Sequence, residues 1–187
     1  AAPFPRTSAP APTVHVTPWP SEAPLFLLVC LVALSLWAVI AISIVGLVYA
    51  VMLGAFFFVA HLTLITYVRG SAVRLSPQQF PELHARVETL AQRAGLSRAP
   101  EAYVMQADGS LNAFATRFLR THLIVLYTDL LDACEGDDSA RDIIIGHELG
   151  HVRAGHLRWH WVLIPGMIVP FLGAAYSRAR ELTCDRY

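Results

Sequence analysis

The chain has 187 residues, which is enough for one domain of ordinary size plus a membrane segment but too few for several domains. Acidic and basic residues balance at 14 each, so the net charge gives no sign of a nucleic-acid partner. All basic residues are arginine, which excludes chemistry that needs a lysine. The three cysteines, Cys30, Cys134 and Cys184, lack the spacing of a disulfide framework or of a thiolate zinc site.

Residues 1–24 contain seven prolines, with Ser, Thr and Ala between them and no apolar periodicity. This composition predicts a disordered, proline-rich tail. Because the chain opens with alanine rather than methionine, we expect a trimmed or partial sequence.

Residues 25–68 form an apolar run in which His61 is the single residue that could be charged near neutral pH. One straight helix of this length would measure roughly 66 Å, about twice the hydrocarbon thickness of a bilayer. We therefore predict a transmembrane helical hairpin that turns between Gly46 and Gly54, with one span plus a membrane-embedded helix as the alternative. A signal peptide fits less well, because the run is too long and has no basic leader.

Arg69 and Arg74 are the charged residues nearest the end of the apolar run. They favour the cytoplasmic side for the part that follows. Arginine without lysine, together with many alanines, is typical of a GC-rich bacterial genome. The expected location is thus the bacterial inner membrane, with a multi-pass chain in the lipid bilayer and the part after the apolar run in the cytoplasm.

The next segments alternate between helical and strand patterns. A helix is predicted over 77–95, with Ser76 as its N-cap and Pro77 at its first position. Residues 101–106 and 122–128 are short, rich in β-forming residues and bounded by turn signals such as 108–110, so they predict a small sheet. The second strand is expected to offer a free edge to an extended peptide.

Two more helices are predicted before the main motif. Thr128 is expected to cap a short helix that ends near Cys134. Ser139 and Asp142 resemble a capping box, so the following helix is expected to start at Ser139.

That helix carries the motif His-Glu-x-x-His in the segment GHELGHVRAGH, residues 146–156. On a helix His147 and His151 lie about 40° apart and can reach one metal ion, while Glu148 lies to the side, where a general base could touch a water. A chance match in roughly one chain in a hundred is the alternative. Glycines on both sides of the histidines imply a close approach by another segment. His156 would project away from the site and is predicted to be a packed, hydrogen-bonded histidine.

A third ligand is sought in SRARELTCDRY, residues 177–187. If this segment is helical, Glu181 and Asp185 lie one turn apart. Glu181 would complete a His-His-Glu set, and Asp185 could accept a hydrogen bond from a metal-binding histidine. A surface helix with alternating Arg and Glu explains the same pattern equally well, and Cys184 is a ligand in principle.

His147-Glu148-x-x-His151, followed by Ser-Arg-x-x-Glu-x-x-Cys-Asp-Arg at 177–186, resembles the M48 family of membrane-associated zinc metallopeptidases. Leu-Asn-Ala-Phe-Ala at 111–115 matches a further segment of that family. The resemblance implies an α+β fold, in which the helical hairpin precedes a mainly helical zincin-type domain with a small β-sheet, over residues 69–187. It also implies one Zn²⁺ per chain, held by His147, His151 and Glu181, with Glu148 as catalytic base.

The family pattern also makes Asn112, Ala113 and Phe114 candidate substrate contacts. It implies a membrane-anchored zinc-dependent endopeptidase that cleaves polypeptides, including misfolded membrane proteins. A non-catalytic zinc-binding membrane scaffold, an inactive fragment and a zinc hydrolase with a non-peptide substrate are the alternatives.

Three departures from the family pattern stand out. Cys184 replaces the usual alanine, and only 29 residues separate His151 from Glu181, where other members have transmembrane spans. Residues 161–176 are too short and interrupted for an ordinary span, so they predict a hydrophobic loop or short helix pair at the membrane surface, a lid, or a buried helical hairpin. The chain ends at Tyr187, before the expected oxyanion-stabilising residue, so the domain is expected to be incomplete.

Overall fold

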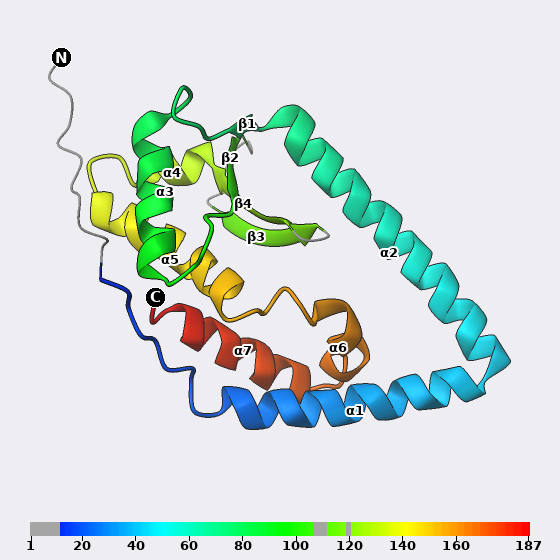
Figure 1. The fold of residues 1–187 in the computed structure, drawn as a ribbon. Helices are drawn as coiled ribbons and strands as arrows, with labels where there is room; N and C mark the ends of the chain where they lie inside the picture. Colours follow the sequence, from blue (N-terminus) through cyan, green and yellow to red (C-terminus); the bar gives the residue numbers. More distant parts are fainter. Residues whose placement is uncertain (1–11, 107–111, 119–120) are drawn as a thin grey trace, which may run out of the picture.

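A computed structural model of the chain describes residues 12–106, 112–118 and 121–187, so the predicted turn at 108–110 and residue 111 lie outside the described residues. The described part is mostly helical with a small mixed sheet, which confirms the α+β prediction (Figure 1). In chain order the elements are α1 (Glu22–Ile42), α2 (Ile44–Ser71), β1 (Val73–Arg74), α3 (Pro81–Arg93), β2 (Glu101–Met105), β3 (Ala113–Phe118), β4 (Thr121–Tyr127), α4 (Thr128–Ala133), α5 (Asp138–Arg153), α6 (His160–Met167) and α7 (Leu172–Cys184).

The apolar run forms two helices, α1 with 21 residues and α2 with 28, and each is long and apolar enough to cross a membrane. The turn predicted between Gly46 and Gly54 is wrong, because the break falls at Ser43 and both glycines lie inside α2. Ser43 is extended, and its hydroxyl accepts a hydrogen bond from the Gly46 N–H at 3.0 Å. A serine that caps a helix in this way ends one helix and starts the next.

The two helices diverge from this junction (Figure 1). α1 runs beside α6 and α7, whereas α2 leads away to β1 at the edge of the sheet. Within α1 the side chains of Val29 and Ala33 are buried, and within α2 those of Ile65 and Val68, close to its C-terminal end. The remaining large apolar side chains of both helices are mostly exposed, as a lipid environment would allow.

The sheet has the order β1-β2-β4-β3. β2 and β4 pair in parallel, and the two outer strands, β1 and β3, are antiparallel to their neighbours. The strands predicted at 101–106 and 122–128 are confirmed as β2 and β4. The expectation that the second of them forms an edge is wrong, because the unpredicted strand β3 pairs with its outer side and itself becomes the edge.

Each face of the sheet packs against different helices. On one face, β-strand side chains such as Ile124 and Leu126 form a core with residues of α3 and α5, including Val87 and Leu149. On the other face, the C-terminal end of α2 packs against alternate residues of β2 and β4. Alternation along a strand sends successive side chains to opposite faces, which is why one short sheet joins α2 to the helix of the His-Glu-x-x-His motif.

Three predicted helix starts are wrong by a few residues. α3 begins at Pro81 rather than Pro77, and Phe80 before it is left-handed with φ 57°. A residue that precedes proline disfavours the α region, so a helix cannot run from Pro77 through Phe80. The N-cap of α4 is Tyr127 rather than Thr128.

α5 begins one residue before Ser139, because Asp137 is its cap. The Asp137 carboxylate accepts hydrogen bonds from the backbone N–H groups of Ser139 and Ala140, both at 3.0 Å. An aspartate at this position also places negative charge at the positive end of the helix dipole.

The apolar segment 161–176 forms a short helix pair, most of α6 and the start of α7, as one of the predicted alternatives expected. This pair packs on α1 through a third apolar cluster that includes Val29, Leu163 and Tyr176. Residues 1–11 of the predicted proline-rich tail lie outside the described residues, and α1 begins at Glu22, inside the range 1–24 predicted for that tail. Within residues 12–21, the Val14 N–H donates to the Arg93 carbonyl at 2.8 Å, so this part lies against the domain.

Candidate metal centre

α5 and α7 together build the candidate centre. Gly146 and Gly150 of α5 face the end of the chain: a Cβ on Gly150 would lie 3.0 Å from a ring carbon of Tyr187 and 3.1 Å from Cα of Cys184. The close approach expected from these glycines is therefore present. It brings the last turn of α7 beside the histidines of α5.

Three side-chain donors converge between these helices. Glu181 Oε2 lies 3.1 Å from His147 Nε2 and 3.4 Å from His151 Nε2. Tetrahedral ligands at roughly 2.0–2.1 Å from a zinc ion would be roughly 3.3 Å apart, so the donor spacing fits zinc. The structure thus brings together the three residues that the sequence predicts as ligands, and two nitrogens plus one carboxylate match a catalytic zinc set with one open position.

Asp185 lies where the sequence expects it, at the C-cap of α7. Its Oδ1 is 2.9 Å from His147 Nδ1, the ring nitrogen that faces away from Glu181. A carboxylate can only accept here, so His147 donates from Nδ1 and leaves the lone pair of Nε2 for a metal.

Glu148 is the most enclosed acidic group of the centre, with 8% of its surface exposed. Burial raises the pKa of its carboxyl group, and the nearby Glu181 adds to this, whereas His147 and the backbone N–H of Ala115 oppose it. A carboxylate with a raised pKa accepts protons more readily, which suits a general base.

The two later histidines differ from the helical extrapolation. α5 ends before Gly155, whose φ of 76° is left-handed, and the chain turns back so that His156 Nδ1 lies 3.1 Å from His151 Nδ1. His156 is buried and hydrogen-bonded as predicted, but it lies beside the centre rather than on the far side of the helix. Burial lowers the pKa of His156, and it lowers the pKa of His151 to about 4, so both rings favour the neutral form that can bind a metal or accept a hydrogen bond.

Glu22 was not predicted as part of the site, yet its Oε1 lies 2.9 Å from His156 Nε2. It is the first residue of α1, 134 positions from His156 in sequence. No spacing rule covers such a distance, and the only available signal was an acidic residue at the start of an apolar helix.

The candidate substrate contacts separate into two groups. Asn112 and Ala113 line a cavity of about 280 Å³ together with His147 and Glu148. The Phe114 ring instead packs against the Tyr127 ring on the opposite face of the sheet, with ring centroids 6.1 Å apart. The structure therefore brings the first two residues to the centre and directs the Phe114 side chain away from it.

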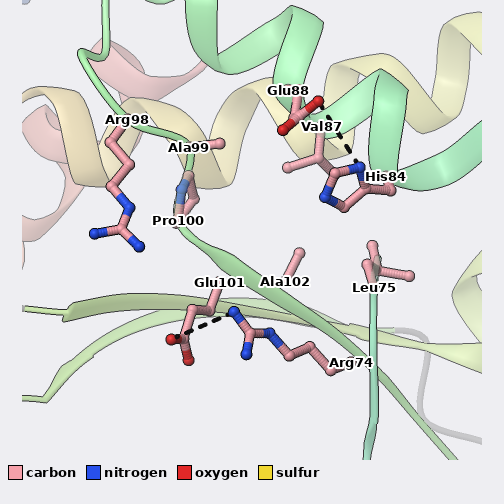
Figure 2. Close-up of a pocket in the computed structure, with 10 residues that line it drawn as sticks. All are labelled: Arg74, Leu75, His84, Val87, Glu88, Arg98, Ala99, Pro100, Glu101 and Ala102. Carbon is pink, nitrogen blue, oxygen red and sulfur yellow. Dashed lines mark ion pairs between the residues drawn. The ribbon is translucent and has the colours of Figure 1, made fainter. Parts of the chain in front are cut away.

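Another pocket, shown in Figure 2, lies between α3 and the start of β2 and includes none of the predicted site residues. Four of its lining residues form ion pairs, Arg74 with Glu101 at 3.7 Å and His84 with Glu88 at 3.8 Å. The chemistry therefore concentrates between α5, α7 and β3.

Comparison with known proteins agrees with this geometry. Residues 77–169 match the model of peptidase family M48. The chain is 40% identical over 77 residues to a Protease HtpX homolog of Bacillus pumilus (strain SAFR-032), which covers 41% of this chain and 25% of that protein. It is 29% identical over 144 residues to CAAX prenyl protease 1 homolog of Arabidopsis thaliana, which covers 72% of this chain and 32% of that protein.

A second Protease HtpX homolog, from Acaryochloris marina (strain MBIC 11017), is 32% identical over 113 residues, which make up 58% of this chain and 35% of that protein. The chain thus spans between a quarter and about a third of the length of the curated relatives it matches. The matched segment contains both histidines and the glutamate of the motif, and α7 adds the third donor beside them. The chain belongs to peptidase family M48.

Proposed function

We propose that this chain acts as a membrane-anchored, zinc-dependent endopeptidase. The observation that carries the proposal is the convergence of His147, His151 and Glu181 at zinc-like spacing, with the enclosed carboxylate of Glu148 beside them. Three protein donors leave one position open, which is the arrangement of a catalytic rather than a structural zinc site.

Glu148 and its surroundings would perform the proton transfers. A zinc ion in this site supplies a Lewis acid that acidifies water and polarises a peptide carbonyl. Glu148 accepts the proton of the attacking water and passes it to the leaving amine. Its burial excludes bulk water from the carboxylate and favours this exchange, because burial raises its pKa toward neutrality.

An extended polypeptide fits the edge of the sheet next to these residues. β3 pairs with β4 on one side and, among the described residues, with no strand on the other. A substrate strand that pairs with this free side would run past Ala113 and Asn112, which share a cavity with His147 and Glu148. We therefore propose backbone recognition at β3 rather than at β4.

The membrane role follows from α1 and α2, the two helices able to span a bilayer. Arg69, in the last turn of α2, and Arg74, in β1, favour a cytoplasmic position for the site in a bacterial inner membrane. The resemblance to family M48 is the ground on which we propose polypeptides, including misfolded membrane proteins, as substrates. We place them ahead of the prenylated substrates that the name of the plant relative indicates.

The test is cleavage of an unfolded protein by the zinc-loaded chain in detergent, beside its Glu148→Gln variant. We expect the parent to cleave, and the variant to bind one zinc ion by metal analysis while its cleavage rate falls by at least about 100-fold. Glu135→Gln is the matched control, because Glu135 is exposed on the loop before α5. This variant should cleave the substrate as fast as the parent.

The outcomes separate the alternatives. Cleavage retained by Glu148→Gln would refute the assignment of the base. Zinc binding without cleavage by the parent would support a non-catalytic scaffold or an inactive fragment. Hydrolysis of a small ester but of no polypeptide would favour a hydrolase with a non-peptide substrate.

A further inference from the structure

A second buried cluster adjoins the centre, and the chemistry proposed above does not use it. Its members are His156, after the end of α5, Glu22 at the start of α1, and Thr183 and Cys184 in the last turn of α7. The side chains of His156 and Glu22 are 3% and 14% exposed. A buried carboxylate and imidazole from distant parts of the chain require a partner or a role, because burial of polar groups is otherwise costly.

The hydrogen bonds in this cluster allow one consistent set of protons. The Glu22 carboxylate can only accept, so His156 must donate from Nε2, at 2.9 Å. A neutral His156 ring then accepts at Nδ1, which means that His151 donates from Nδ1, at 3.1 Å. The remaining nitrogen of His151, Nε2, keeps its lone pair and faces Glu181 Oε2 at 3.4 Å.

We propose that Glu22 and His156 are positioning residues, which fix the tautomer and ring orientation of His151 so that its Nε2 binds the metal. The inference rests on the proposed zinc function of the site. It extends that function to a residue of the first apolar helix, which would hold a metal ligand through one intervening imidazole.

Other contacts hold Glu22 in place. The Thr183 hydroxyl donates to the second oxygen of the Glu22 carboxylate. The same hydroxyl oxygen accepts a hydrogen bond from the backbone N–H of Trp19 at 2.8 Å. The carboxylate is therefore fixed between α1 and α7 before any metal binds, and His156 receives a preformed acceptor.

The two histidine ligands would then be oriented in different ways. His147 donates directly to Asp185, whose side chain is 61% exposed, at the end of the neighbouring helix. His151 is oriented through His156 by a carboxylate that is nearly enclosed. Hydrogen bonds are stronger in an enclosed, weakly polar environment than in water. We therefore expect the ring of His151 to be held more firmly than the ring of His147.

The same atoms offer one competing interpretation. His151, His156 and Cys184 have donor atoms within 4.8 Å of one another and could hold a second metal. Two observations favour the hydrogen-bonded arrangement. His151 Nε2 faces Glu181 Oε2 at 3.4 Å, so a second metal at His151 Nδ1 would require the ring to lose both of its protons. Burial also raises the pKa of the Cys184 thiol, which disfavours the thiolate that metals bind. The Cys184 sulfur lies 3.6 Å from His156 Nδ1, farther than His151 Nδ1 does.

The experiment measures zinc affinity of the full chain in detergent, by competition with a chelating dye, for Glu22→Ala, His156→Ala and the double variant. Each single change is expected to weaken zinc binding roughly 10- to 100-fold, because second-shell partners of zinc ligands have effects of this size. The double variant should bind zinc about as tightly as the weaker-binding of the two single variants, because both changes interrupt the same chain of hydrogen bonds. Glu22→Gln keeps an acceptor oxygen and should bind zinc more tightly than Glu22→Ala.

Two controls separate positioning from general stability. Glu101→Ala removes another partly buried carboxylate, which pairs with Arg69 instead of with a residue of the centre. This change should leave zinc affinity unchanged. The thermal midpoint of each zinc-free variant reports any loss of folding, and zinc affinity is compared only at temperatures where the variant is folded.

Unchanged zinc affinity in both single variants, or losses that add in the double variant, would overturn the inference while the proposed function stands. Two zinc ions per parent chain, one of them lost in Cys184→Ala, would overturn it in favour of a second metal site. A parent chain that binds no zinc would overturn the proposed function and, with it, this inference.

Discussion

The two long helices α1 and α2 differ in what they contact, although both are strongly apolar. The most apolar stretches of α1 and α2 have mean hydropathies of 3.0 and 2.2, and both helices are long enough to cross a bilayer. α1 packs along α6 and α7 and brings Glu22 to the metal centre. α2 contacts the sheet near its C-terminal end (Figure 1), and the rings of Phe57 and His61 contact Trp161 of α6. Most other large apolar side chains of α2 are exposed.

This difference teaches that hydrophobicity alone does not separate a mostly exposed apolar helix from one that packs beside the candidate metal centre. The useful signal is small residues where backbones meet. Ala33 of α1 and Gly166 of α6 lie at the contact between the two helices, as small residues do where membrane helices pack closely. In α2, Gly54 has open space around it.

The largest effect is expected for Gly166→Ala. The added Cβ would lie 2.5 Å from the carbonyl oxygen of Val29 and 3.2 Å from the Cβ of Ala33, so α6 would have to move off α1. Overpacking against a backbone atom should lower the free energy of unfolding by roughly 3 kcal/mol or more. Reversible unfolding in detergent, followed by circular dichroism, measures this loss.

Gly54→Ala is the matched control for that prediction. Its Cβ would meet no atom within 4 Å, and alanine favours a helix over glycine by roughly 1 kcal/mol, so stability should stay the same or rise. Equal destabilisation by the two substitutions would mean that α1 and α2 are packed alike, and the comparison would fail.

Leu53→Arg tests the other half of the comparison, the role of α2 as an anchor. Leu53 is 56% exposed in the first half of α2, and an arginine there should make membrane insertion less favourable by about 3 kcal/mol. The inserted fraction, measured by resistance to alkaline extraction from membranes, should fall, whereas Leu53→Ala should remain inserted. Zinc affinity of the detergent-solubilised variant should match the parent, and a large loss would show that α2 also supports the centre.

The fold was predictable where local sequence decides it. β2 and β4 followed from short runs of β-formers, and the two long helices from apolar length. The alternation of Phe114, Thr116 and Phe118 was a usable strand signal for β3, but the small and charged residues between them obscured it. Which strand lies at the edge depends on pairing between segments, and no single segment contains that information.

The centre was predictable because its ligands obey helical spacing. His147, Glu148 and His151 share one helix, and Glu181 and Asp185 lie one turn apart at the end of another. The surroundings of His151 were not predictable in the same way. Gly155 ends α5 and reverses the chain, and Glu22 arrives from the opposite end of the sequence, so tertiary packing alone brings them together.

The smallest effect is expected for Arg186→Ala, which asks whether α1 positions Glu22 by itself or needs the segment before it. The Arg186 guanidinium lies 4.7 Å from the centre of the Trp19 ring and donates to the Thr17 carbonyl at 2.8 Å. Because Arg186 is exposed, its loss should cost only roughly 0.5–1 kcal/mol. Digestion by a non-specific protease within residues 12–21 should become several-fold faster, whereas Arg178→Ala, an exposed change in α7, the helix just before Arg186, should have no effect.

The zinc affinity of the Arg186→Ala variant shows whether the segment 12–21 helps to position Glu22. If packing of α1 on α6 and α7 positions Glu22, the Arg186→Ala variant should bind zinc within about a factor of two of the parent, since α1 itself is untouched. A loss as large as that of Glu22→Ala would instead assign the positioning to residues 17–19. The functional difference between α1 and α2 would then begin in the proline-rich segment rather than in the helix, because Glu22 would depend on how that segment is held against α7.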